Sequence, residues 1–271
     1  MTTSADEQQQ LRAILTRLES VKRYEALTTS SSSAWDVQPG SALAGDDAKT
    51  NPYQVSHLAW QALTVASDHL HCLRLSLVGD QQGDEITVTM HPYAQATLVR
   101  AAFENAARAV WLLAPGKRLT RIQRRLALQV DNNTHSDRMH DLLGTAPNRT
   151  ATERTRQIRD LAVRAGIPVS DVKKELTFGY KKMVRTAGDH LAGVGADQAE
   201  AVWSACSALA HGDIHSMSFL ERDVLGRVGN VALARLSTDS KILLWITTIT
   251  VQMIEYGFQL YKERASCHSG T

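Results

Sequence analysis

The segment from residue 94 to residue 114, AQATLVRAAFENAARAVWLLA, is apolar on almost every side when it is drawn as a helix. Val99, Phe103, Ala106, Val110 and Leu113 follow one another at helical spacing and form a continuous stripe. A helix that is hydrophobic all round is stable only where other elements cover it. The segment therefore predicts a fold in which several elements surround one buried helix.

Helical periodicity also dominates the rest of the chain, and the alternation typical of strands is scarce. We predict helices over about 5–27, 52–78, 92–114, 117–143, 150–165, 169–187, 198–211 and 239–265. Residues 224–236 contain two glycines and some alternation, which predicts a small hairpin, and residues 79–90 are expected to hold one short strand or an extended loop. The predicted fold class is all-α: a multi-helix bundle of about eight helices with at most one small β-hairpin.

The first 50 residues differ in composition from the remainder. Residues 28–52 are rich in Ser, Gly, Asp and Pro, which is typical of a loop or linker, and Asn51–Pro52 fits a cap and first turn of the next helix. We therefore divide the chain into an N-terminal helical arm with a Ser/Gly-rich linker (1–50) and a helical bundle domain (51–271). The arm packs either on the bundle or on a second subunit, and the second alternative predicts a homodimer.

Overall composition is that of an ordinary soluble globular protein, with 43% hydrophobic and 21% charged residues. The longest apolar run, 242–254, is about 13 residues long, which is short of the roughly 20 that a membrane span needs. The first ten residues are polar, unlike a secretory signal, and the three cysteines form no motif. We expect a cytoplasmic protein with no cofactor and no membrane contact.

Three charged residues interrupt the apolar helix of 94–114. Arg100, Glu104 and Arg108 stand at i, i+4 and i+8, so they share one face. Buried charges are costly unless they are paired. The charged ladder is therefore either a self-neutralising row at a seam between helices or one wall of a polar cavity, and ionisable groups in such interiors often belong to functional sites.

A second polar face lies on the predicted helix 198–211, where Glu200, Ser204, Ser207 and His211 line up. Gly212 is typical of the residue just past a helix end. Because a helix end separates His211 from His215, we do not expect this pair to bind zinc. Two Asp-x-x-His pairs, at 68–71 and 137–140, could join Glu104 and Glu200 in a dinuclear metal site, but we predict no metal site.

The net charge of +2 is distributed unevenly, because residues 117–185 hold 16 Lys/Arg against 7 Asp/Glu. Such a segment is either the solvated face of bundle helices or a surface for phosphate groups. We predict nucleic-acid contacts from five of its residues: Arg121, Arg124, Arg125, Lys173 and Lys174.

Residues 158–176, IRDLAVRAGIPVSDVKKEL, resemble a helix-turn-helix unit. Ala162, Gly166 and Val172 occupy the positions of its small residue, turn glycine and core aliphatic, and Ser170 could cap the second helix. Glu175 departs from the motif, because an aliphatic residue is expected there. The alternative to DNA binding is a helical hairpin at the surface.

Two features together carry a resemblance to a known group of proteins: the Arg100-x-x-x-Glu104 helix and the Ser207-Ala-Leu-Ala-His-Gly212 helix end. They resemble uncharacterised bacterial all-helical proteins with the character of HEPN domains, the helical modules of toxin and phage-defence ribonucleases, over roughly 51–265. HEPN nucleases carry an arginine four to six residues before the histidine. His211 lacks such an arginine, although the spacing occurs at Arg185 and His190.

The resemblance implies a protein that binds RNA or cleaves it without a metal. A histidine would act as general base on the 2′-hydroxyl, and an arginine would stabilise the developing phosphorane charge. On this reading His211, Arg100 and Glu104 are catalytic, supported by Ser204, Ser207 and Arg108. The alternatives are a DNA-binding regulator using 158–176, and a non-catalytic helical protein that binds a partner or a small ligand. Convergence of the ladder with His211 in one cavity would favour catalysis.

Overall fold

In a computed structural model of the chain, residues 4–29, 33–82, 85–176 and 179–267 are described. These residues form nine α-helices, four short 3₁₀ turns and two antiparallel hairpins. The helices are α1 (Ala5–Thr29), α2 (Ala42–Thr50), α3 (Val55–Leu77), α4 (Ala94–Leu113), α5 (Arg118–Leu143), α6 (Ala151–Ala165), α7 (Gly179–Gly188), α8 (Gly195–His211) and α9 (Ser240–Ala265). The 3₁₀ turns are η1 (Ser33–Trp35), η2 (Val169–Asp171), η3 (Lys174–Leu176) and η4 (Ile214–Phe219), and the strands are β1 (Val78–Gln82), β2 (Glu85–Val88), β3 (Leu220–Val228) and β4 (Val231–Thr238).

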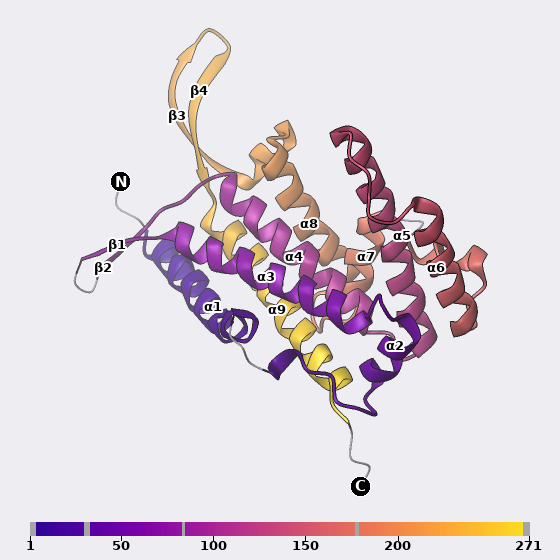
Figure 1. The fold of residues 1–271 in the computed structure, drawn as a ribbon. Helices are drawn as coiled ribbons and strands as arrows, with labels where there is room; N and C mark the ends of the chain where they lie inside the picture. Colours follow the sequence, from indigo (N-terminus) through magenta and orange to yellow (C-terminus); the bar gives the residue numbers. More distant parts are fainter. Residues whose placement is uncertain (1–3, 30–32, 83–84, 177–178, 268–271) are drawn as a thin grey trace.

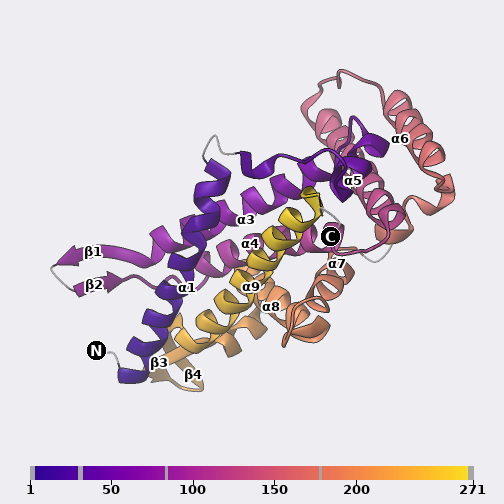
Figure 2. The same ribbon diagram turned by 90° about the horizontal axis from the view of Figure 1, so that it is seen from below.

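Helix α4 is the central helix of the bundle, as its sequence predicts. It packs against α3, α9, α7 and α8, while α1 covers α3 and α9 from the outside (Figures 1 and 2). Its stripe residues Val99, Phe103 and Val110 are completely buried. Burial of about 25 cal/mol for each Å² of apolar surface is the dominant stabilisation of such a bundle. The all-α prediction is confirmed.

Helices α5 and α6 form an outer pair at one side of the bundle (Figure 1). They have a small hydrophobic cluster of their own, separate from the main core, in which Ile122 and Leu126 of α5 pack against Ile158 and Leu161 of α6. Val172, between η2 and η3, closes this cluster. The pair is joined to the bundle through the first half of α5, where Arg121 bonds Asp46 of α2 and Arg125 bonds the carbonyl of Gln54.

The interpretation of residues 28–52 as a linker is wrong for residues 42–50, which form α2. Ser41 caps this helix, because its side chain accepts a hydrogen bond from the amide of Ala44. Helix α2 packs on α3, α5, α6 and α9, and α1 packs on α3 and α9, so both helices pack on the bundle. Asn51 ends α2, and α3 begins at Val55, not at Pro52.

Two further boundaries differ from the prediction. The single helix expected over 169–187 is broken into η2, η3 and α7, with residues 177–178 outside the described chain. Pro168 lacks an amide hydrogen, and Gly166 adopts a left-handed conformation with φ of 79° that ends α6. The chain therefore leaves α6 through short turns that cross the side of the α5–α6 pair.

Two hairpins are present where at most one was predicted. β1 pairs with β2, starting from Val78 opposite Val88, and the sequence of β1, VGDQQ, gives no alternation by which it could be recognised. β3 and β4 extend the predicted 224–236 hairpin to residues 220–238, with Val228 opposite Val231 and a bulge after Val224. This second hairpin projects from the bundle in Figure 1. Within the described residues, no helix is both long and apolar enough to cross a membrane.

Candidate functional site

The charged ladder of α4 faces the seam that α4 makes with α7 and α8. An Arg100 guanidinium nitrogen lies 3.9 Å from a Glu104 carboxylate oxygen, and the indole N–H of Trp203 donates to the same carboxylate at 2.9 Å. Arg108 donates weakly to the hydroxyl of Tyr180, at 3.4 Å, and its guanidinium lies 5.5 Å from the centre of that ring. Aromatic side chains of α7 and α8 therefore contact the ladder along the seam.

Ion pairs between α7 and α8 continue this seam. Glu200 of α8 receives hydrogen bonds from Lys181 and Arg185 of α7, and these bonds lower the pKa of the Glu200 carboxyl. Arg185 also lies 2.8 Å from Asp197. Opposite charges alternate along the row, so the seam largely neutralises itself. This arrangement matches the structural alternative for the ladder, a row of ions at a helix–helix contact.

His211 does not meet the ladder. It is the last residue of α8 and is exposed, and Gly212 follows in a left-handed conformation with φ of 68°. Helices α4 and α8 run past each other so that Trp203 contacts Glu104, whereas Leu209 packs with Ala96. No hydrogen bond or ion pair joins the His211 side chain to another residue in the described part of the chain. Of the three residues predicted to be catalytic, Arg100 and Glu104 are therefore paired with each other, and the His211 side chain is bonded to neither of them in the described chain.

The other histidine features are similarly scattered. His190 is exposed just after α7, and the arginine five residues before it, Arg185, is held by Glu200 and Asp197. Ser204 is exposed and Ser207 is half-buried on the same side of α8 as His211.

The Asp-x-x-His pairs are occupied by other partners. His71 pairs with Glu25, Asp137 pairs with Arg154, and the ring of His140 hydrogen-bonds the hydroxyl of Thr145 at 2.8 Å. Among the residues with a described placement, His, Cys, Asp and Glu nowhere gather in a group of three that could hold a metal ion.

Arg121, predicted to contact nucleic acid, lies in the interior. Its Nε and a terminal nitrogen donate to the two carboxylate oxygens of Asp46 at 2.5 and 3.0 Å, and its other terminal nitrogen donates to the carbonyl of Pro115 at 2.8 Å. Arg121 is 2% exposed and Asp46 is fully buried. Burial raises the pKa of Asp46, although Arg121 and the more exposed Arg118 oppose the shift. A phosphate group cannot reach this guanidinium in the folded chain.

The side chains of Arg124 and Arg125 are also bonded to other residues of the fold. Arg124 donates to Glu175 at 2.9 Å and stacks 4.5 Å over Trp111, and burial lowers its pKa. Arg125 donates to the carbonyl of Gln54 at 3.1 Å, and burial lowers its pKa to about 10. The prediction of a phosphate-binding row on α5 is therefore wrong for its three arginines.

Lys173, just before η3, and Lys174, its first residue, do lie at the surface, and Lys174 pairs with Asp171 at 2.6 Å. They do not belong to a recognition helix. The helix-turn-helix motif needs a second helix after Gly166, and residues 169–176 form two 3₁₀ turns instead. The interpretation of 158–176 as a helix-turn-helix is wrong for this reason.

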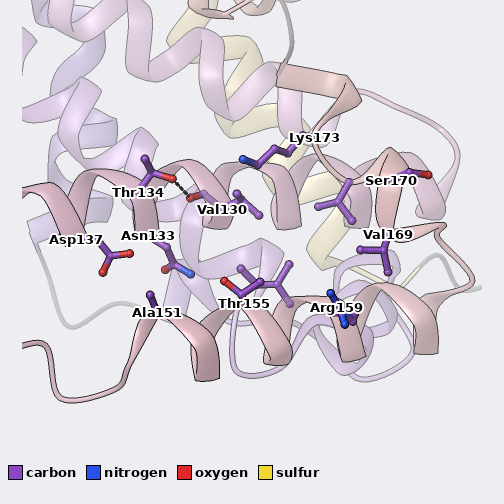
Figure 3. A pocket seen from close by; sticks show the side chains of 12 residues that line it. Val130, Asn133, Thr134, Asp137, Ala151, Thr155, Arg159, Val169, Ser170 and Lys173 are labelled. Carbon is purple, nitrogen blue, oxygen red and sulfur yellow. Dashed lines mark hydrogen bonds between the residues drawn. The ribbon is translucent and has the colours of Figure 1, made fainter.

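A hollow lies between α5 and α6 and is closed at one end by η2 (Figure 3). Its volume is about 450 Å³. Buried Ile158 and Val172 form its floor together with Val130, and Val169, which is 44% exposed, forms part of the rim. The polar groups of the lining are Asn133, Thr134, Asp137, Thr155, Arg159, Ser170 and Lys173.

The polar groups of this α5–α6 pocket differ in how far they are already bonded. Asp137 is paired with Arg154, and the Thr134 hydroxyl donates to the carbonyl of Val130 at 3.1 Å. The Asn133 carbonyl oxygen accepts from Gln129, which leaves its amide N–H groups to the pocket. Neither the Thr155 hydroxyl nor the Arg159 guanidinium has a hydrogen bond or ion pair within the described chain. Donor groups are therefore available beside an apolar floor.

A second hollow, of about 690 Å³ and more open, lies between α1 and α9. Aromatic rings dominate it: Tyr24 stacks on Phe258 with ring centres 4.4 Å apart, and Trp60 packs against Tyr261 at 4.9 Å. The Tyr261 hydroxyl donates to the carbonyl of Trp35 at 2.7 Å, and Arg23 pairs with Glu255 across the rim. Its principal polar groups are thus bonded to one another, unlike those of the α5–α6 pocket.

Comparisons of the chain with models of protein families, with curated proteins and with solved structures found no match. The resemblance to HEPN domains stays a prediction that rests on two short motifs. The pocket residues Asn133, Thr155 and Arg159 were not anticipated from the sequence. For the two residues of α6 the sequence signal is helical spacing, which places Thr155 and Arg159 on adjoining sides of that helix with Ile158; Asn133 of α5 carries no such signal.

Proposed function

We propose that this protein is a non-catalytic binding protein that holds a small molecule between α5 and α6. The observation that carries the proposal is the α5–α6 pocket, in which an apolar floor adjoins donor groups with no described partner. Its volume of about 450 Å³ lies within the range of about 300–1,000 Å³ that ligand pockets occupy. This is the third of the functions that the sequence left open.

A pair of matched variants tests this proposal. Thr155 lines the pocket, whereas Thr152 lies one turn earlier on the exposed surface of α6 and is not part of the lining. Thr155→Trp places an indole in the pocket, and Thr152→Trp adds the same group outside it. Fragments that bind the unmodified protein in a ligand-observed NMR screen are expected to lose binding to Thr155→Trp and to keep it with Thr152→Trp. Equal binding to both variants would refute the proposal.

RNA binding remains a second candidate, supported by the exposed positive charge of the same region. Arg156, Arg159 and Arg164 of α6 are exposed, and so are Lys173 and Lys174. Binding through such a surface depends on phosphate neutralisation, so its affinity falls steeply with salt. The double variant Lys173→Glu with Lys174→Glu is expected to lose affinity for RNA, which is measured by fluorescence anisotropy with a labelled single-stranded RNA. Unchanged affinity in this double variant counts against the candidate.

RNA cleavage is the finer form of that candidate and rests on the HEPN resemblance. Its test is hydrolysis of a labelled RNA in the presence of EDTA, with His211→Ala and Arg100→Ala as variants. Loss of cleavage in both variants would support general-base and charge-stabilising roles for these residues. Cleavage that survives both changes, or no cleavage by the unmodified chain, refutes the catalytic form and leaves RNA binding to its own test.

The homodimer is likewise a proposal, and the β3–β4 hairpin is the feature that favours it. Five of its apolar side chains are more than half exposed, from Val224 and Leu225 at 53% to Val228 at 83%. The hairpin is also an isolated two-stranded sheet, so each strand keeps one open edge. Open edges and exposed apolar side chains are both typical of surfaces that associate.

A further inference from the structure

We infer that the ligand of the α5–α6 pocket is a small anion with an apolar body, whose carboxylate or phosphate group is bound by Arg159. This inference rests on the proposed binding function and specifies its ligand class. It follows from three features of the pocket: the balance of charge on its lining, the kind of hydrogen-bonding groups it offers, and the position of its apolar residues.

The charge that the pocket presents is positive. The only carboxylate of its lining, Asp137, is neutralised by Arg154. Asp171, just beyond the lining, receives a hydrogen bond from Ser170 at 3.0 Å and pairs with Lys174 at 2.6 Å. Arg159 has no such partner in the described residues. An anion entering the pocket therefore meets one uncompensated guanidinium, and the carboxylates of Asp137 and Asp171 are already bonded.

The hydrogen-bonding groups beside Arg159 are also suited to an anion. Asn133 offers the N–H groups of its amide, because its carbonyl oxygen already accepts from Gln129 at 2.9 Å. Thr155, between Asn133 and Arg159 along the pocket, offers a hydroxyl (Figure 3). A guanidinium presents a planar fork of donors that matches the geometry of carboxylate and phosphate oxygens. Among the described residues of the lining, the one carboxylate, that of Asp137, is already paired with Arg154, so the pocket offers less to a cationic ligand.

The apolar residues require more than a bare ion. Val130 and the buried side chains of Ile158 and Val172 form the floor. Val169 stands on the rim beside Arg159 (Figure 3). Burying a ligand's apolar surface against them contributes about 25 cal/mol for each Å² removed from water. Inorganic phosphate would leave this floor uncovered, so the pocket favours an anion that carries a hydrocarbon or ring. At about 450 Å³ the pocket admits a small molecule and excludes a folded macromolecule.

The test compares probes that share one apolar body and differ in their headgroup. Octanoate, octyl phosphate, 1-octanol and octylamine are titrated below their micellar concentrations into the full chain, with inorganic phosphate as the anion without a body. Binding is followed by NMR chemical shifts. We expect octanoate or octyl phosphate to bind at least about tenfold more tightly than octanol, because hydrogen bonds to charged groups contribute about 1.5–3 kcal/mol. The two anions separate a carboxylate ligand from a phosphate ligand.

Two variants of α6 complete the test. Arg159→Gln is expected to weaken the binding of the anion about tenfold or more and to leave the binding of octanol unchanged. Arg164→Gln is a change of the same kind outside the lining and should alter the affinity for neither probe. Octanol or octylamine binding as tightly as the anions, or an unchanged anion affinity in Arg159→Gln, would overturn the inference. Octanol binding that Thr155→Trp abolishes would still support the proposed function. Failure of every probe would overturn both.

Discussion

Removal of Asp46 is expected to be among the most destabilising single changes in this chain. Its carboxylate is fully buried and accepts two hydrogen bonds from Arg121, which is itself 2% exposed. Asp46→Ala leaves the guanidinium buried with only the carbonyls of Pro115 and Gly116 as partners. Breaking a buried pair in this way costs about 3–5 kcal/mol. In a chain of this size each kcal/mol of lost stability lowers the melting temperature by about 2–4 °C. We therefore expect Asp46→Ala to lower the melting temperature by about 6–20 °C.

The assay is thermal and urea unfolding followed by circular dichroism, with two control variants. Arg118→Ala removes the second arginine that pairs with Asp46. Because the Arg118 side chain is 53% exposed, its loss should lower the free energy of unfolding by at most about 1 kcal/mol. In Asp46→Leu with Arg121→Met both charges are gone, so much of the loss should be recovered, because apolar replacement of a whole buried pair is often neutral or stabilising. An Asp46→Ala effect no larger than that of Arg118→Ala would refute the reasoning.

Three further outcomes are expected. Gly188→Ala should destabilise the chain by about 1–3 kcal/mol in urea unfolding, because the added Cβ would lie 2.6 Å from the carbonyl oxygen of Gly195. The control Gly116→Ala adds a Cβ that meets no atom within 4 Å and should not destabilise the chain. Burial raises the pKa of Cys206 to about 12, so the native protein should react with a thiol reagent at its two other cysteines, which are exposed, and at all three after unfolding; three rapid reactions in the native state would contradict this. Val228→Ser with Leu233→Ser, at 83% and 66% exposed positions of the β3–β4 hairpin, should convert a dimer to a monomer in light scattering, and a monomeric unmodified chain would refute the proposed homodimer.

The sequence was most informative where one local pattern decides the structure. The segment 94–114 can only be a buried helix, and α4 is the centre of the bundle. Gly212 indicated the end of α8, because glycine adopts the left-handed backbone conformation found there with the least strain. Helix α2 was missed because its local sequence, ALAGDDAKT, has weak helical character. Its position depends on Asp46 meeting Arg121, a partner 75 residues away that no local pattern reveals.

The candidate site could be predicted less well than the fold, for the same physical reason. A count of Lys and Arg over 117–185 is correct, but it cannot distinguish Arg124, stacked on Trp111, from Arg159, which faces a pocket. The distinction depends on tertiary contacts between segments distant in sequence. The α5–α6 pocket itself exists because the chain after Gly166 forms short turns where the pattern predicted a helix, so the error in the local structure and the missed site have one origin.

The most direct measurement is a crystal structure of the full chain soaked with 8-bromooctanoate, with data collected at the bromine absorption edge. The proposed function and ligand class predict an anomalous bromine peak between α5 and α6, over Ile158 and Val172, with the carboxylate at Arg159. A peak confined to the aromatic hollow between α1 and α9, or a pocket without bromine at a concentration that saturates binding in solution, would contradict them.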